Sequence, residues 1–403
     1  MKIAILTSGI LPVPAVQGGA VENLIDFYLE YNNLHRLHDI TVYSVWHPDV
    51  EKHLALKSEV NHYQYINTST VFAKMKRRLY KFSHSNEYYN YFIEFFFEEA
   101  CRQIKKEQYD CIILENRPGY TYKLSRRGGT LGKNIVLHLH NDLLNSETPY
   151  AQYIYNSLKR VVTVSDYIKQ RVETIPNTIP SDTDAKVVTV YNGIYLQHFT
   201  KSNSTRLKRK EFGFSEKDFV LAYSGRLNKE KGIAQLIDAM LLLKDLPQIK
   251  LMIMGSTFFA NATNEDSFVQ TLKEKALPIK EQLVFTGFVP YDQVPDYLEL
   301  ADMAVIPSVW AEPFGLTVVE AQAMGLPTIV SNQGGIPEIV NDKCAIIIPT
   351  DSHYEENLAD AIRQLYHSPQ RRAEMAAASL RNAAGYGKER YARDFFKALE
   401  SKE

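Results

Sequence analysis

The feature of this chain that most restricts its fold is an alternation of short apolar runs and amphipathic segments along most of its length. Runs such as "ITVYSV", "CIILEN" and "NIVLHLH" are bounded by polar or turn residues, as buried strands are. Between the runs, "AVENLIDFYLE" and residues 86–106 have helical periodicity. Five apolar residues of the first segment share one helical face: Val21, Leu24, Ile25, Tyr28 and Leu29. This alternation predicts an α/β fold with parallel sheets that are covered by helices on both faces.

The alternation occurs in two series, separated by a polar and basic stretch that begins near Tyr195. We therefore predict two Rossmann-like parallel-sheet domains that face each other across a cleft. The N-terminal domain is expected over residues 1–195, a linker over 196–215 and the C-terminal domain over 216–380. Residues 381–403 are expected to form a helix that returns towards the N-terminal domain. Ligands of such sheets bind at the carboxyl ends of the strands.

Composition excludes several classes of protein. The 403 residues suffice for two or three domains, and a net charge of -1 gives no reason to expect nucleic acid as a partner. The three cysteines (Cys101, Cys111 and Cys344) lack disulfide or metal-ligand spacing, which indicates a reducing compartment. No run approaches the roughly 20 apolar residues that cross a bilayer, and "MKIAILTSGILPVP" lacks a signal-peptide cleavage site. These features predict a soluble, cytoplasmic protein.

A first candidate site is "SGRLNKEKG", residues Ser224–Gly232, which follows an apolar run and opens a helix. Gly225 allows close approach of the backbone, and Arg226 and Lys231 place two cations near the helix N-terminus. This combination suits a diphosphate, because helix N–H groups and guanidinium forks both favour anions. An ordinary strand–helix loop with solvated charges is the alternative.

A second candidate site is "EPFGLTVVE", which begins at Glu312 and ends at Glu320. Pro313–Gly315 breaks the chain before a helical pattern, so three amides are expected to be free for a phosphate: those of Gly315, Leu316 and Thr317. Glu320, one turn further, suits a vicinal diol such as that of a ribose. Glu312 suits the hydroxyls of a second sugar and is expected on a solvent-facing loop, as is Lys231. Helix-dipole complementation alone would explain one acid near a helix start, but not both acids together with Arg226 and Lys231.

Two histidines mark the carboxyl end of an N-terminal strand. His138 and His140 alternate along "NIVLHLH" and share a face of the sheet, where two histidines are uncommon. Asn141 and Asp142 follow directly and add polarity. We therefore expect a site role for His140, whereas a packed and hydrogen-bonded histidine is the alternative.

These motifs, with "QGGA", "FTGFV", "GGIPEIV", "HND" and "YNGI", resemble the retaining glycosyltransferases of family 4, which have the GT-B fold. The resemblance covers nearly the whole chain and rests on the order and spacing of the motifs. The chain departs from the family at Tyr195, where an acid is usual, and at "NDKCAIII", which lacks a usual glycine.

The resemblance implies a retaining hexosyltransferase that moves a sugar from a UDP-linked donor to a glycan or lipid-linked acceptor of the cell surface. It implies neither a metal nor a cofactor. The leaving diphosphate would be stabilised electrostatically rather than displaced by a carboxylate nucleophile. The implied catalytic residues are His140, Glu312, Arg226 and Lys231. The implied donor-binding residues are Gly18, Gly19, Gly225, Phe288, Val289, Phe314, Gly315, Leu316, Thr317 and Glu320.

The acceptor side has fewer signals. Between Val60 and Asn86 the chain has no acid, and the basic residues of Lys74–Lys81 alternate with apolar ones. This stretch fits a helix on an anionic membrane surface at the inner face of the membrane, or a solvated basic helix with an apolar core face. For the acceptor itself we expect three side chains: Arg117, Asn141 and Asp142.

Three other functions fit part of the pattern. A GT-B-fold UDP-sugar 2-epimerase would break the same bond without an acceptor. A catalytically silent nucleotide-sugar-binding protein would be expected to have lost some of Glu312, Glu320, Arg226 and Lys231, all of which are present. A dinucleotide-dependent dehydrogenase is disfavoured, because "QGGA" after a long loop replaces G-x-G-x-x-G after the first strand.

Overall fold

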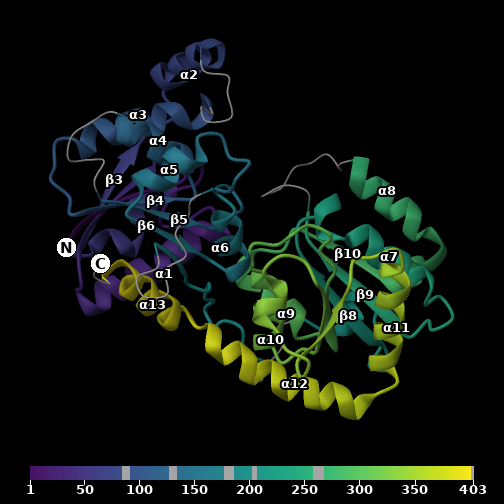
Figure 1. Ribbon diagram of the computed structural model, residues 1–403. Coiled ribbons are helices and arrows are strands. Elements are labelled where there is room, and N and C mark those ends of the chain that lie inside the picture. Colours follow the sequence, from purple (N-terminus) through teal and green to yellow (C-terminus); the bar gives the residue numbers. More distant parts are fainter. Residues whose placement is uncertain (84–90, 127–133, 177–185, 202–206, 257–266, 401–403) are drawn as a thin grey trace. The chain divides into compact units, whose positions relative to one another are not determined.

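The structure is a computed structural model that describes the chain except for residues 84–90, 127–133, 177–185, 202–206, 257–266 and 401–403 (Figure 1). The chain forms two compact units. The N-terminal unit comprises Met1–Gly193 together with Lys388–Glu403, and the C-terminal unit comprises Ile194–Gly387.

The N-terminal unit contains a parallel sheet of seven strands in the order β3-β2-β1-β4-β5-β6-β7. The strands are β1 (Lys2–Leu6), β2 (Asp39–Val45), β3 (Asn61–Ile66), β4 (Cys111–Glu115), β5 (Ile135–Leu139), β6 (Arg160–Thr163) and β7 (Val187–Thr189). The helices are α1 (Ala20–His35), α2 (Val71–Ser83), α3 (Tyr91–Ile104), α4 (Pro118–Arg126), α5 (Ala151–Ser157), α6 (Asp166–Glu173) and α13 (Lys388–Glu400). Helices α1 and α13 cover one face of the sheet, and α3, α4 and α5 lie over the other (Figure 1).

The apolar face predicted for α1 is the one that the fold buries. Leu24, Ile25, Tyr28 and Leu29 are buried, and Val21 packs partly buried at the edge of the same cluster. The C-terminal helix α13 packs on α1, and the rings of Tyr28 and Phe395 stack with centroids 4.5 Å apart. Helix α13 is therefore part of the core of the N-terminal unit.

The C-terminal unit contains a parallel sheet of six strands in the order β10-β9-β8-β11-β12-β13. The strands are β8 (Phe219–Ser224), β9 (Ile249–Met254), β10 (Leu283–Gly287), β11 (Met303–Ile306), β12 (Thr328–Ser331) and β13 (Ala345–Ile348). The helices are α7 (Ile233–Leu241), α8 (Ser267–Ala276), α9 (Val294–Leu298), α10 (Leu316–Ala323), α11 (Tyr354–Tyr366) and α12 (Pro369–Ala383). Helices α7, α8 and α11 lie on one side of this sheet and α10 and α12 on the other (Figure 1). Two parallel sheets, each covered by helices on both faces, confirm the predicted α/β fold class.

Two predicted segments reach into residues that the structure does not describe. Of the helix expected over 86–106, residues 86–90 lie outside the described residues, and α3 begins at Tyr91. Of the stretch 196–215, residues 202–206 lie outside them. In the remainder, Arg209 donates to the carbonyl oxygens of Leu300 and Asp218 and pairs with Asp302 at 2.9 Å. This basic stretch is therefore anchored to the C-terminal unit at Arg209.

Among the described residues, no helix has the length and apolar content that crossing a membrane requires.

Candidate active site

The loop between β8 and α7 is fixed by backbone contacts. The amide of Gly225 donates to the carbonyl of Met254, and a Cβ on Gly255 would lie only 1.9 Å from the Gly225 oxygen. The Asn228 side chain accepts from the amide of Lys231, which caps a short 3-10 turn over Lys229–Lys231. Gly232 then has a φ of 69°, and a Cβ there would meet the Pro307 carbonyl oxygen at 1.7 Å. The tight turn keeps Lys231 close to the segment that follows β11.

The fold brings the two candidate sites of the C-terminal unit into contact. The Lys231 ammonium donates to Glu312 Oε1 at 2.5 Å, although the two residues are 81 positions apart. Ser308 Oγ donates to the same carboxylate oxygen at 2.8 Å, and the Lys231 nitrogen lies 5.5 Å from the centroid of the Trp310 ring. Lys231 is partly buried and Arg226 is exposed. Glu312 is only 7% exposed, so the expectation of a solvent-facing loop is wrong for this residue.

Gly334 and Gly335, the two glycines of "GGIPEIV", hold the backbone of Glu312. The Gly335 amide donates to the Glu312 carbonyl oxygen at 2.7 Å. Gly334 has a φ of 60°, and a Cβ there would lie 2.2 Å from the same oxygen. Glycine is therefore required at Gly334 by both conformation and space.

Helix α10 starts where the sequence predicts. Gly315 precedes its first turn with a φ of 107°, and the Gly315 carbonyl accepts from the amide of Val318. The amides of Leu316 and Thr317 precede the first intrahelical donor, so they have no carbonyl partner within the helix. Phe314 is buried, with its ring 6.0 Å from that of Tyr386. These amides and the helix dipole favour an anion at this end of α10.

Glu320, within α10, is a buried acid. Burial, partly offset by a hydrogen bond with Tyr291, raises the pKa of its carboxyl group to about 7. Tyr291 comes shortly after Phe288, which is exposed, and Val289, which is buried. Sequence reasoning missed Tyr291, because nothing in a single tyrosine of a loop indicates an acid on a distant helix.

In the N-terminal unit, Gly18 and Gly19 have φ values of 74° and 109° and lead directly into α1. A Cβ on Gly19 would lie 2.2 Å from Glu22 Oε2. Glu22 is buried in the first turn of α1, and burial raises the pKa of its carboxyl group. This carboxylate beside the two glycines is a further group that sequence reasoning missed.

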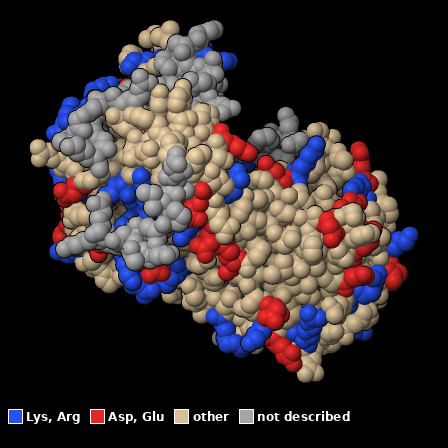
Figure 2. Space-filling view, viewed as in Figure 1, with Lys and Arg blue, Asp and Glu red and all other residues tan. Residues whose placement is uncertain are grey.

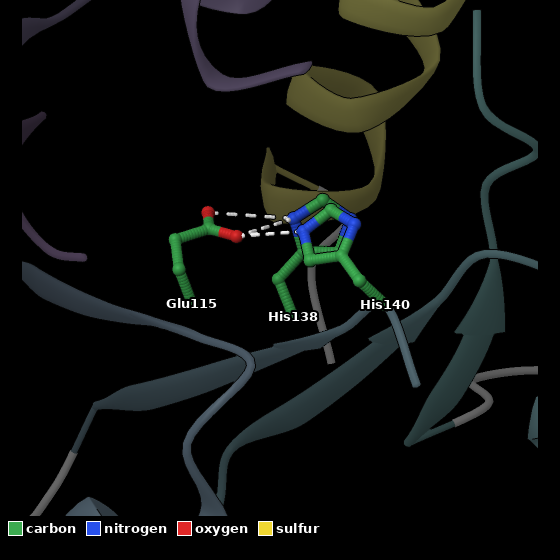
Figure 3. Close-up of side chains that lie close together, drawn as sticks. All are labelled: Glu115, His138 and His140. Atoms are coloured by element: carbon green, nitrogen blue, oxygen red, sulfur yellow. Dashed lines mark hydrogen bonds and ion pairs between the residues drawn. The ribbon is translucent and has the colours of Figure 1, made fainter. Parts of the chain in front are cut away.

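His140 belongs to a buried cluster of four side chains, which we call the Glu115 cluster: Tyr28, Glu115, His138 and His140. Figure 3 shows three of them, Glu115 with the two histidines. His140 Nε2 lies 2.9 Å from Glu115 Oε2, and His138 Nδ1 lies 3.1 Å from the same oxygen. Burial and, to a smaller extent, the neighbouring His138 lower the pKa of His140 to about 4, although the contact with Glu115 acts in the opposite direction. Burial alone would raise the pKa of Glu115, but the charges and hydrogen bonds of the two histidines hold it well below its usual range.

The loops after β4 and β5 enclose a cavity of about 320 Å³. Arg117 and Asp142 both line this cavity, whereas Asn141 is not among its lining residues. Arg117 Nε donates to the Ser8 carbonyl, and Asp142 pairs with Arg171 at 2.6 Å. Asn116, Asn145 and Glu147 add further polar groups to the lining. Two of the three predicted acceptor residues therefore share one pocket.

The matches to known families cover the chain in two parts. Residues 30–198 match the family "Glycosyltransferase Family 4", and residues 204–381 match "Glycosyl transferases group 1". The chain therefore belongs to the glycosyltransferases of the GT-B type, with a family 4 domain followed by a group 1 domain.

The chain is also similar to individual proteins. The chain is 28% identical to the spore coat protein SA of Bacillus subtilis over 99% of both chains. It is 27% identical to the lipopolysaccharide 1,2-N-acetylglucosaminetransferase of Salmonella typhimurium over 54% of this chain and 53% of that enzyme. The crystal structure of HepE from Anabaena in complex with UDP and glucose superposes with a TM-score of 0.73, at 20% identity and over 100% of both chains. At that identity the last comparison shows the fold alone.

Proposed function

We propose that this protein is a retaining, metal-independent hexosyltransferase that moves a sugar from a UDP-linked donor to a glycan or lipid-linked acceptor in cell-surface polysaccharide or glycolipid synthesis. The observation that carries the proposal is the contact of Lys231 with Glu312 beside the N-terminus of α10. The Lys231 ammonium and the free amides of α10 can bind phosphates, and the Glu312 carboxylate can bind hydroxyls. Together they suit a ligand that has both kinds of group. The complex of HepE with UDP and glucose, and the Salmonella lipopolysaccharide enzyme, support the donor and acceptor classes.

The proposed mechanism follows from the charges of the C-terminal unit. Arg226, Lys231 and the first-turn amides of α10 would stabilise the negative charge that grows on the leaving diphosphate. Because the protein itself supplies this positive charge, we propose that transfer needs no metal. Glu312 is positioned by Ser308 and Gly335, so a hydroxyl of the transferred sugar can bind its second oxygen. Glu320 would bind the ribose diol, and the backbone at Phe288 and Val289 would contact the base.

In the N-terminal unit, we assign His140 to the transferred sugar and Gly18 and Gly19 to the phosphates. The cavity lined by Arg117 and Asp142 is assigned to the acceptor, since amide, guanidinium and carboxylate groups can all bind sugar hydroxyls. The acceptor hydroxyl would attack the anomeric carbon from the face that the diphosphate vacates as its bond to the sugar breaks, and would give its proton to that diphosphate. This course retains the anomeric configuration.

A panel of nucleotide sugars tests the proposal. We expect slow release of UDP from one of UDP-glucose, UDP-galactose or UDP-N-acetylglucosamine without acceptor, unchanged by a chelator, and no release from GDP-mannose. Calorimetry should show binding of the same donor. If no donor is bound or cleaved, the proposal is wrong, and conversion of the donor to its 2-epimer would favour an epimerase. NMR of a transfer product should show the anomeric configuration of the donor.

We also propose that α2 contacts an anionic membrane. Val71, Phe72, Met75 and Leu79 expose between 52% and 85% of their surface on this helix. The helix also has exposed basic side chains, among them Lys74 and Arg78, and some basic atoms are visible at this end of the N-terminal unit (Figure 2). Exposed apolar and basic side chains on one helix are typical of helices that bind the membrane interface.

Sedimentation with vesicles tests this contact. The protein should partition onto vesicles with 30% phosphatidylglycerol and not onto pure phosphatidylcholine. The double substitution Lys74→Glu and Arg78→Glu should weaken binding by at least about thirtyfold, since each basic residue near the surface contributes roughly 1 kcal/mol and the added carboxylates are repelled by the anionic lipid. Lys217→Glu with Lys244→Glu, both exposed in the C-terminal unit, is the matched control and should leave binding unchanged. Equal losses in the two variants would contradict a specific role for α2.

A further inference from the structure

A buried carboxylate at the end of β4 binds three side chains from other elements. Glu115 is fully buried, and it accepts a hydrogen bond of 2.9 Å from the Tyr28 hydroxyl of α1. The same carboxylate contacts His138 of β5 at 3.1 Å and His140, just beyond β5, at 2.9 Å (Figure 3). An isolated buried charge is costly, so three donors around one carboxylate indicate a built arrangement rather than an accidental contact.

The two histidines have different surroundings. The ring of His138 is completely buried and packs against Phe395 of α13, with centroids 4.9 Å apart. The side chain of His140 retains 4% exposure, and its backbone amide donates to Asn116 Oδ1 at 3.1 Å. Asn116 lines the cavity that we assign to the acceptor. His138 is therefore part of the packed core. His140 lies nearer the surface, at the outer edge of the Glu115 cluster.

The contact with Glu115 determines which nitrogen of His140 carries the proton. An ionised carboxylate only accepts hydrogen bonds, so Nε2, at 2.9 Å, must be the protonated nitrogen. Nδ1 then keeps its lone pair, and among the described residues it has no hydrogen-bond partner. A neutral His140, consistent with its lowered pKa, leaves one acceptor site without a donor. A donor from a bound ligand would satisfy it.

We propose that Glu115 is a positioning residue for sugar transfer: it fixes His140 in the tautomer whose Nδ1 accepts a hydrogen bond from a hydroxyl of the transferred sugar. This inference rests on the proposed function, because it needs a sugar at His140. The buried negative charge of Glu115 also lies behind the neutral ring. It therefore favours positive charge that develops at the anomeric carbon of the sugar as the diphosphate leaves.

The same residues have the ligand types of a metal site, with the ligand atoms of Glu115, His138 and His140 within 4.8 Å of one another. Metal-bound histidines almost always donate their other N–H to a carboxylate, carbonyl or water. Here neither His138 Nε2 nor His140 Nδ1 has a partner among the described residues. Direct hydrogen bonds to Glu115 therefore explain the geometry better than a metal does.

NMR of the wild-type protein tests the tautomer directly. In protein labelled with ¹⁵N-histidine, His140 should show a protonated Nε2 and an unprotonated Nδ1 at pH 7, with the signal assigned by its loss in His140→Gln. A proton on Nδ1, or on both nitrogens, would overturn the inference. So would a stoichiometric transition metal in the purified protein, since it would replace the hydrogen bonds. These measurements need neither activity nor a variant at Glu115, so they remain decisive if Glu115→Gln does not fold.

Kinetics test the positioning role. Glu115→Gln should lower kcat for donor cleavage by about tenfold, the effect of one lost hydrogen bond, while KM for the donor changes less than about threefold. The matched control is Glu400→Gln, because Glu400 pairs with the buried His38 at 3.1 Å, at the amino end of β2. This control should keep wild-type kcat. An unchanged kcat in a folded Glu115→Gln protein would overturn the inference, whereas a wild-type protein that binds no donor would instead contradict the proposed function.

Discussion

Replacing Lys231 by alanine is expected to lower kcat/KM for donor cleavage by about 10²- to 10³-fold, the usual effect of removing one group that stabilises transition-state charge. The Lys231 ammonium would bind the leaving diphosphate, and it also pairs with Glu312 at 2.5 Å. Its removal therefore takes away positive charge and leaves a carboxylate that is 7% exposed without its counter-charge. Steady-state release of UDP with the donor found in the panel is the measurement.

Two further variants show whether the loss comes from this contact. Lys229→Ala removes an exposed lysine of the same short turn and should keep near-normal activity. Glu312→Gln keeps the size of a buried side chain, so it is preferable to alanine at this position. Because Lys231 and Glu312 act as a pair, the double variant should lose less than the product of the two single losses. Near-normal cleavage by Lys231→Ala would mean that the donor site lies elsewhere.

The parts of the fold that the sequence predicts are those with local causes. Strands buried on both faces appear as continuous apolar runs, so the two parallel sheets follow from the pattern of the chain. The start of α10 follows from Gly315. Lys231 and Glu312 were both predicted for one site, and the structure adds that they touch.

The parts that the sequence does not predict depend on which strands are neighbours. Glu115 ends β4 and looks like the first residue of an acceptor loop. Only the pairing of β4 with β5, which sets Glu115 opposite His138, reveals its partners. A signal was available, since an acid at the end of one apolar run and two histidines at the end of the next can meet at one sheet edge. Tyr291 gives no such signal, because it reaches Glu320 of α10 from a short 3-10 turn between β10 and α9.

Donor affinity is expected to fall as the pH is lowered through about 7, because Glu320 then becomes protonated. The pKa of its carboxyl group is raised to about 7, chiefly by burial. Ionised, the group accepts hydrogen bonds from both hydroxyls of a ribose, whereas the protonated group must use one oxygen as a donor. The Kd of the intact UDP-sugar should therefore rise by up to about tenfold per pH unit below 7.

The stability of the free protein should change in the opposite sense over the same range. Since the folded pKa of Glu320 lies above the ordinary value of 4.5, its contribution is fully present below pH 4.5 and is lost as the pH rises through about 7. Asp26, whose pKa burial also raises to about 7, contributes with the same sign in the N-terminal unit. The pH dependence of thermal unfolding therefore contains the contributions of both acids, whereas the pH dependence of donor binding depends on Glu320 alone.

Calorimetry between pH 5.5 and 8.5 on two variants separates the effect of Glu320 from other titrations. Glu320→Gln should weaken binding by about a hundredfold at pH 8, as expected for the loss of hydrogen bonds to a charged group, and should remove the pH dependence. Tyr291→Phe keeps the ring but removes the hydrogen bond that lowers the pKa of Glu320, so the midpoint of the pH dependence should move above 7.

The intact UDP-sugar is the ligand of choice, because a terminal phosphate such as that of free UDP titrates near pH 6. A wild-type Kd that is constant from pH 6 to 8, or a midpoint that moves downward in Tyr291→Phe, would show that Glu320 does not bind the donor.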